Sequence, residues 1–169
     1  MIRAPISGAG GATMDTTANI FASMREDEAQ AVIALWQLCG LTRPWNDSAA
    51  EIALAWDGAA SDILVHRTGG MPVASVQVGH DGRRAWVYSL VTHPDHRRKG
   101  LARAAMAAAE AWAIARDVPK MHLMIRPGNE EVIAFYEAAG YADGNILVMQ
   151  KWLDPAREAL YPGPPKRDA

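Results

Sequence analysis

The sequence has little cysteine, no long apolar run and no excess of basic charge. Cys39 is the only cysteine among 169 residues, so an internal disulfide is excluded, and we expect this residue in the core. No apolar stretch approaches the roughly 20 residues that a membrane-spanning helix requires. The net charge of −2 at pH 7 is unlike that of general nucleic-acid binders, which carry a strong basic excess. These shortages favour a cytoplasmic protein that binds neither membranes nor nucleic acid.

A metal-binding pattern is missing as well. His93, His96 and His122 lie at no spacing typical of a metal site, so we predict no metal. Hydrophobic residues, in contrast, make up 50% of the chain. A chain of this length and composition suffices for one domain that buries about 70% of its unfolded surface.

We expect this domain over residues 18–153, between a flexible leader and a proline-rich tail. The leader, residues 1–17, is rich in glycine and alanine, and Met14 within it is an alternative start. The tail, residues 154–169, contains four prolines. It either drapes over the body of the protein or stays disordered.

Alternating hydrophobicity and turn signals predict a chain of mixed helices and strands. Asp81-Gly82 is typical of a tight hairpin turn between two strands, and Asp47 is a suitable cap for a helix. The predicted strands cover residues 19–24, 62–67, 73–80, 84–92, 121–126, 141–145 and 147–152. The predicted helices cover residues 26–39, 47–56 and 101–116, and a further helix follows Asn129.

The most informative stretch joins a strand, a basic loop and an alanine-rich helix. The strand ends before Pro94, and the helix starts directly after Gly100. Backbone N–H groups in the first turn of a helix have no intrahelical partners, so this end of the helix stabilises a phosphate. A glycine here lets a ligand approach the backbone, and the neighbouring cations attract its charge: Arg97, Arg98, Lys99 and Arg103. A solvated helix start is the alternative interpretation.

Two motifs in this sequence resemble those of one enzyme family. The pattern Arg97-x-x-Gly100-x-Ala102 resembles the (Gln/Arg)-x-x-Gly-x-(Gly/Ala) loop of the GNAT superfamily of N-acetyltransferases, which holds the pyrophosphate of acetyl-coenzyme A. The second motif, Asn129 followed seven residues later by Tyr136 and then by Gly140-Tyr141, looks like the other signature of that superfamily.

The resemblance covers roughly residues 19–153. Within the superfamily, three segments look like a small bacterial subgroup often labelled YpeA-like: residues 40–47, 81–86 and 118–120. The resemblance implies an α/β (α+β) fold with a mixed, mostly antiparallel sheet of about six to seven strands, flanked by about four helices.

The family resemblance also implies a donor, acetyl-CoA, and the residues that bind it. The pantetheine arm would pair with the backbone of the fourth strand, and the loop would hold the pyrophosphate. The donor-binding residues implied are Leu90, Val91, Thr92, Arg97, Arg98, Lys99, Gly100, Leu101, Ala102, Arg103 and Asn129. As an alternative, Asn129 acts only as the N-cap of the following helix.

Tyr136 matches the family's general acid, which protonates the leaving thiolate after an amine attacks the thioester directly. A phenol has a pKa near 10 and a thiol one near 8.5, so Tyr136 is neutral at pH 7 and able to donate. The alternative is a buried helix tyrosine that satisfies a backbone group. Main-chain amides of the fourth strand would polarise the thioester oxygen.

The base that deprotonates the amine is not evident, because residues 85–92 contain no acidic side chain. Trp45, Asn46 and Tyr88 are the candidate acceptor-binding residues, with Trp45 as a packing residue in the alternative interpretation. We predict an N-acetyltransferase, monomeric or homodimeric, that acts on a primary amine of a small molecule or protein. A non-catalytic acyl-CoA-binding module is the alternative.

Overall fold

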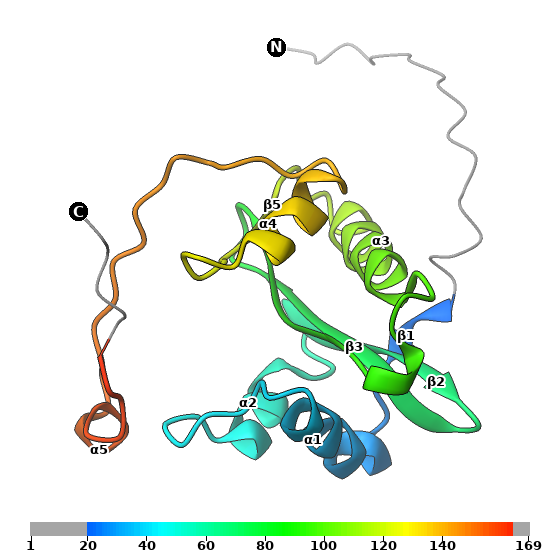
Figure 1. Ribbon diagram of the computed structural model, residues 1–169, viewed down its shortest axis with the longest axis horizontal. Helices are drawn as coiled ribbons and strands as arrows, with labels where there is room; N and C mark the ends of the chain where they lie inside the picture. Colours follow the sequence, from blue (N-terminus) through cyan, green and yellow to red (C-terminus); the bar gives the residue numbers. More distant parts are fainter. Residues whose placement is uncertain (1–19, 164–169) are drawn as a thin grey trace.

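The computed structural model describes residues 20–163, so the predicted leader and the end of the predicted tail lie outside the described range. Five strands form one mixed sheet in the order β1-β2-β3-β4-β5 within this range (Figure 1). Neighbouring strands are antiparallel except β4 and β5, which are parallel. The bounds are Ala22–Ser23 for β1, Ser61–Thr68 for β2, Met71–His80 for β3, Ala85–Thr92 for β4 and Met121–Leu123 for β5. The mixed, mostly antiparallel α/β sheet is therefore confirmed.

Helices α1 to α4 follow the sequence prediction closely, whereas α5 lies in the predicted tail, where no helix was expected. They are α1 (Ala29–Leu38), α2 (Ser48–Ala55), α3 (Leu101–Ile114), α4 (Glu130–Glu137) and α5 (Pro155–Glu158), with 3-10 turns at Glu26–Glu28 and Pro94–His96. The predicted cap of α2 is confirmed, because the Asp47 carboxylate accepts hydrogen bonds from the amides of Ala49 and Ala50. Satisfying these first-turn donors explains why α2 begins where it does.

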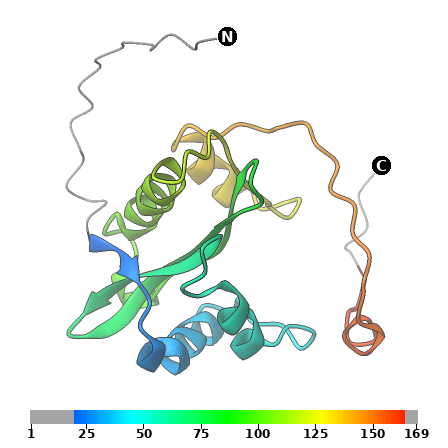
Figure 2. The same ribbon diagram turned by 180° about the vertical axis from the view of Figure 1, so that it is seen from behind.

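Helices cover both faces of the sheet. Figures 1 and 2 show α3 on one face and α1 with α2 on the other. The side chains of β2 alternate between the two layers: Leu64 joins the core under α3, whereas Ile63 and Val65 join the core under α1 and α2. The larger side chains of α3, Met106 and Trp112, are only 2% and 8% exposed and belong to the core.

Alanines bring α3 close to the sheet. Ala104, Ala105 and Ala109 are at most 1% exposed and pack in the same cluster as the valines of β3. Because a methyl group is the whole side chain, the helix backbone lies near the strands and the direction of the α3 N-terminus is well defined.

The strand prediction is wrong at the C-terminal end. Residues 141–145 and 147–152 form no strand, so the described sheet has five strands rather than six to seven. Residues 142–163, here called the C-terminal arm, instead leave α4 in a wide arch and end at α5, beside the segment that joins α1 to α2 (Figure 1). A strand gains its stability from a partner, and no backbone hydrogen bond joins residues 142–163 to a strand within the described range.

Candidate functional site

A cleft opens where β4 and β5 separate. The two strands pair only between Ala85–Val87 and Met121–Leu123, although β4 continues to Thr92. The cleft has a volume of about 470 Å³ and is lined by both strands, by the start of α4 and by the segment between α1 and α2. Predicted site residues from distant parts of the sequence therefore meet in this cleft.

A β-bulge on β4 faces this cleft. Ser75 of β3 is opposite Val91, and Gln77 is opposite Tyr88, so two residues of β4, Ser89 and Leu90, lie opposite one residue of β3. Ser89 has a φ of 51°, a left-handed conformation that is uncommon for residues other than glycine. The bulge bends β4 and leaves backbone groups of Ser89 and Leu90 outside the regular ladder.

Two buried side chains support the bulge from behind. The Trp36 indole donates a 2.9 Å hydrogen bond to the Ser75 hydroxyl. The same hydroxyl donates a 3.5 Å hydrogen bond to the Ser89 carbonyl oxygen. Ser75 is fully buried, so both interactions are shielded from water. The sequence gives no signal for this bulge, because no glycine or proline marks it.

The basic loop leads from the end of β4 to α3, as predicted. Gly100 is the N-cap of α3 with a φ of 79°, and no side chain among residues 20–163 caps the helix in its place. A Cβ added at Gly100 would meet nothing within 4 Å, so the space beside its Cα atom at the helix start is open. An open, uncapped helix start fits the pyrophosphate of a coenzyme A donor.

The cations of the loop have no acidic partner within the described part of the chain. The Lys99 ammonium donates to the Asp95 carbonyl oxygen at 3.0 Å, and the Arg97 Nε group lies 3.5 Å from the Thr92 carbonyl oxygen. Arg98 and Arg103 are exposed. Their positive charge is therefore available at the same helix end.

Tyr136 of α4 places its ring in the cleft. The residue is 8% exposed, and burial raises the pKa of its hydroxyl. Phe135 and Tyr141 hold the ring edge to face, with centroids 5.0 and 5.7 Å away. Its hydroxyl has no hydrogen-bond partner among residues 20–163, whereas that of Tyr141 donates to Glu110 at 2.7 Å. Among these residues, the alternative role of satisfying a backbone group therefore finds no support.

Asn129 lies at the start of α4 and also lines the cleft. It occupies the N-cap position, but its side chain makes no capping hydrogen bond. Asn129 is exposed and follows a turn at Gly128, whose φ is 81°. The structure thus contradicts a capping role for the side chain and leaves its amide open to a ligand.

The three predicted acceptor residues come together in the cleft. Trp45 and Asn46 line it from the segment between α1 and α2, and Tyr88, which is 42% exposed, lines it from β4. Trp45 also packs against Tyr161 of the arm, with ring centroids 5.2 Å apart. Trp45 therefore serves both as a wall of the cleft and as a packing residue.

Sequence reasoning missed Glu51. This residue of α2 lines the cleft and is half-buried, and burial raises the pKa of its carboxyl group. Ser48 also lines the cleft, and the spacing of three residues places both on one helix face. Ile52 and Ala55 of the same helix lie in the core. This helical spacing is the sequence signal that could have indicated the position of Glu51 at the cleft. Glu51 brings a carboxylate to a site whose strand β4 has none.

The other predicted positions have structural explanations. Val91 and Leu101 are 8% exposed and belong to the core, so only their backbone is available to a ligand. Ala102 follows in the first turn of α3. Cys39 is half-buried at the edge of the core, with its Sγ atom 3.5 Å from the Thr92 carbonyl oxygen.

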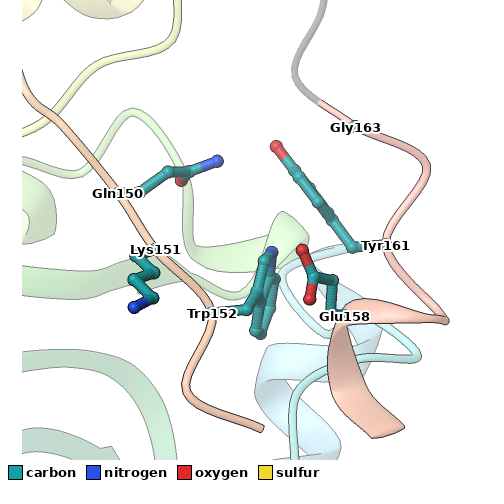
Figure 3. A pocket seen from close by; sticks show the side chains of 6 residues that line it. All are labelled: Gln150, Lys151, Trp152, Glu158, Tyr161 and Gly163. Atoms are coloured by element: carbon teal, nitrogen blue, oxygen red, sulfur yellow. The ribbon is translucent and has the colours of Figure 1, made fainter. Parts of the chain in front are cut away.

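A second hollow, of about 460 Å³, lies within the C-terminal arm (Figure 3). Figure 3 shows its lining residues on two limbs of the arm, with Gln150, Lys151 and Trp152 on one limb and Glu158, Tyr161 and Gly163 on the other. None of them belongs to the basic loop, the bulge or α4. The cleft between β4 and β5 is therefore the candidate active site.

Residues 20–163 hold neither a candidate metal-binding cluster nor a candidate membrane-spanning helix. The histidine, cysteine and acidic side chains there form no group of three or more that could hold a metal ion. Likewise, no helix in this range combines the length and the apolar character that a membrane crossing demands.

Comparison with known proteins identifies the family. The sequence matches the profile described as "Acetyltransferase (GNAT) family" over residues 24–141, which includes both motifs and the whole cleft. The chain belongs to the GNAT acetyltransferase family. An acetyltransferase of Pectobacterium atrosepticum is 40% identical over 134 residues, which cover 79% of this chain and 95% of that protein. An acetyltransferase of Sodalis glossinidius is 38% identical over 130 residues, covering 76% and 92%.

Solved GNAT structures share the fold. A putative acetyltransferase from Agrobacterium tumefaciens superposes with a TM-score of 0.67 at 20% identity, covering 78% of this chain and 99% of that one. The aminoglycoside N-acetyltransferase AAC(6')-Iy, in complex with the bisubstrate analogue CoA-S-monomethyl-acetylneamine, gives a TM-score of 0.66 at 14% identity, covering 78% and 96%.

Proposed function

We propose that this GNAT protein is an N-acetyltransferase that transfers the acetyl group of acetyl-CoA to a primary amine by direct attack. The observation that carries the proposal is the free hydroxyl of buried Tyr136 in the same cleft as the bulge at Ser89 and Leu90. The open start of α3 adds a phosphate site at the end of the same strand. Location in the cytoplasm stays a prediction.

The donor site would use backbone groups and loop cations. The backbone of Leu90, Val91 and Thr92 would align the pantetheine arm, and the first-turn amides of α3 with the loop cations would hold the pyrophosphate. Amides displaced by the bulge would polarise the thioester oxygen, which develops negative charge during attack. Holding two reactants together in this way is worth about 7–11 kcal/mol of barrier.

The chemical step needs one proton donor and one proton acceptor. The amine nitrogen forms a bond to the thioester carbon, the carbon–sulfur bond breaks, and the amine loses a proton. The Tyr136 hydroxyl protonates the departing sulfur, and its raised pKa keeps it in the donor form at neutral pH. A proton from solvent restores the phenol, so the net products are the amide and free coenzyme A thiol.

Glu51 would supply the carboxylate that β4 lacks. A primary amine has a pKa near 10.4, so it reaches the cleft mostly as an ammonium ion. A carboxylate in the cleft attracts that cation, and a raised pKa makes Glu51 a better acceptor for its proton. Trp45, Asn46 and Tyr88 would form the remaining walls around the acceptor.

The test is release of coenzyme A thiol from acetyl-CoA with a panel of small amines and amine-bearing peptides. We expect Tyr136→Phe to lower kcat by about 100-fold or more, with the Kd for acetyl-CoA unchanged. Tyr141→Phe is the matched control, because it removes a neighbouring hydroxyl that donates to Glu110. Equal turnover in wild type and Tyr136→Phe would contradict the acid role.

The absence of an acid on β4 favours one other function, a non-catalytic acyl-CoA-binding module. That function predicts tight binding of acetyl-CoA with no thiol release for any amine. The same panel therefore distinguishes the two.

A further inference from the structure

A strip of polar and aromatic side chains continues from the cleft along one face of β4 and β5. Ala85 and Val87 of β4 are buried in the core under α3, so the alternate residues Trp86 and Tyr88 point to the opposite face. Tyr88 lines the cleft, and Trp86 is the next residue on the same face of the strand. Figures 1 and 2 show β5 at the end of the sheet remote from α1 and α2, the helices of that face.

The neighbouring strand continues the strip and adds positive charge to it. Trp86 is opposite His122 in the register, and the two rings meet edge to face with centroids 5.0 Å apart. Two residues further from the cleft, the chain places Arg84 before β4 and Lys120 before β5. Burial lowers the pKa of the His122 imidazole, and the positive charges of Lys120 and Arg84 lower it further. Both cations therefore lie near His122.

These two cations have no acidic partner within the described part of the chain. The ion pairs of residues 20–163 join other side chains, and the Arg84 Nε atom is buried there without a hydrogen-bond partner. Asp81 lies nearby, but the hairpin turn occupies its carboxylate. It accepts hydrogen bonds from the backbone amides of Arg83 and Arg84 at 2.8 and 2.7 Å and from the Trp86 indole at 3.3 Å. A buried donor without an acceptor is costly, and an anionic ligand would remove that cost.

The other end of the strip carries the opposite charge. Glu51 of α2 lines the cleft together with Tyr88. A strand rises about 3.3 Å per residue, so Tyr88 and Arg84 are about 13 Å apart along β4. A molecule that satisfies both ends has an ammonium group near Glu51 and an anionic group about four residues of extended chain away.

We propose that the acceptor is the amino terminus of an extended peptide with an acidic side chain near its fifth residue. This inference rests on the proposed function, because it assigns the amine that enters the same cleft. The amino terminus would lie beside Glu51, and the chain would cross Tyr88 and Trp86, whose rings provide contact area at low entropic cost. Its acidic side chain would then reach Arg84 and Lys120.

The test uses three C-terminally amidated pentapeptides that differ only at the fifth residue, which is glutamate, glutamine or lysine. Calorimetric titration in the presence of free coenzyme A measures Kd, and thiol release from acetyl-CoA measures kcat/KM. We expect the glutamate peptide to bind at least about fivefold more tightly than the glutamine peptide, and the lysine peptide to bind most weakly. These differences should shrink at high salt.

Charge-removing variants locate the preference on the strip. Lys120→Gln, at an exposed position, should reduce the preference for the glutamate peptide, and the double variant Arg84→Gln with Lys120→Gln should abolish it. The Kd of the glutamine peptide should stay unchanged in both, which also shows that they fold. Lys151→Gln is the matched control, because it removes a positive charge from the exposed arm.

The two readouts separate this inference from the proposed function. Preferential binding of the glutamate peptide without thiol release would support the anion subsite and contradict the transferase. Thiol release with equal kcat/KM for the three peptides would support the transferase and overturn the anion subsite. The subsite is also overturned if none of the peptides binds, or if the preference survives in the double variant.

Discussion

Two regions of the molecule differ in how well their apolar side chains are buried. One is the sheet with the helices α1, α2 and α3, here called the framework, and the other is the C-terminal arm. Val32, Ile63, Val65, Val76 and Val78 in the sheet and its helices are all 0% exposed. In the arm, by contrast, ten consecutive residues are exposed and a four-residue apolar run has no cover. The proposed donor-binding elements therefore lie on a core that one chain packs completely, whereas the apolar run of the arm is exposed.

The strongest test of this contrast is Glu28→Gln in the framework. The Glu28 carboxylate is 4% exposed and accepts hydrogen bonds from Arg67 Nε at 2.5 Å and Nη2 at 2.6 Å. Removing one partner of a buried pair costs about 3–5 kcal/mol, and Arg67 is partly exposed, so we expect about 3 kcal/mol in urea unfolding. Glu26→Gln, at an exposed neighbour, should change stability by less than about 0.5 kcal/mol.

The same pair sets a pH dependence. The hydrogen bonds from Arg67 lower the pKa of Glu28 below its usual 4.5, despite burial. A carboxyl group with a lowered pKa stabilises the folded state fully above its unfolded pKa, and this contribution is lost as the pH falls through the folded pKa. We expect the stability difference between wild type and Glu28→Gln to shrink below about pH 4.5. A difference that persists in acid would contradict the ion pair as its source.

Gly100→Glu should separate donor binding from folding. The new side chain would occupy the open space before the α3 amides and place a negative charge there, so we expect a Kd for acetyl-CoA about 100-fold weaker, or ~2.7 kcal/mol. Gly100→Ala shares the strain of a positive φ but not the charge, and isolates the blocking effect. Calorimetric titration measures both. Equal affinities of the two variants would show that the loop does not hold phosphate.

Glu51→Gln should act on the acceptor alone. We expect the KM for the amine to rise about tenfold, ~1.4 kcal/mol, with donor affinity unchanged. Because a base acts when deprotonated, kcat/KM of the wild type should rise with pH through the raised pKa of Glu51, and the variant should lose this inflection. Glu131→Gln, exposed on α4, serves as the control for charge. An unchanged pH profile would remove Glu51 from the proton path.

Tyr161→Ala in the arm should have the smallest effect. The edge-on contact with Trp45 is worth about 0.5–1.5 kcal/mol, so global stability should fall by no more than about 1.5 kcal/mol. Donor affinity should not change, and Tyr161→Phe should behave as wild type. A loss as large as that of Glu28→Gln would show that the arm belongs to the framework.

The parts of the fold predicted from sequence are those with local signals. The hairpin at Asp81-Gly82 and the helix cap at Asp47 act within a few residues, and both form as expected. The strand at residues 147–152 has the right composition, yet strand formation depends on a partner edge that no local pattern specifies. For the same reason the bulge at Ser89 and the placement of Glu51 appear only once distant segments pack together.

The hydrogen-bonded chain from Trp36 through Ser75 to Ser89 restricts how this sequence can drift. Ser75 is 0% exposed and faces an indole N–H on one side and the bulge carbonyl on the other. A change to alanine would leave both groups unsatisfied, and a larger residue would press on the α1 tryptophan. Positions 36 and 75 are therefore expected to change together among descendants of this protein, although they lie 39 residues apart.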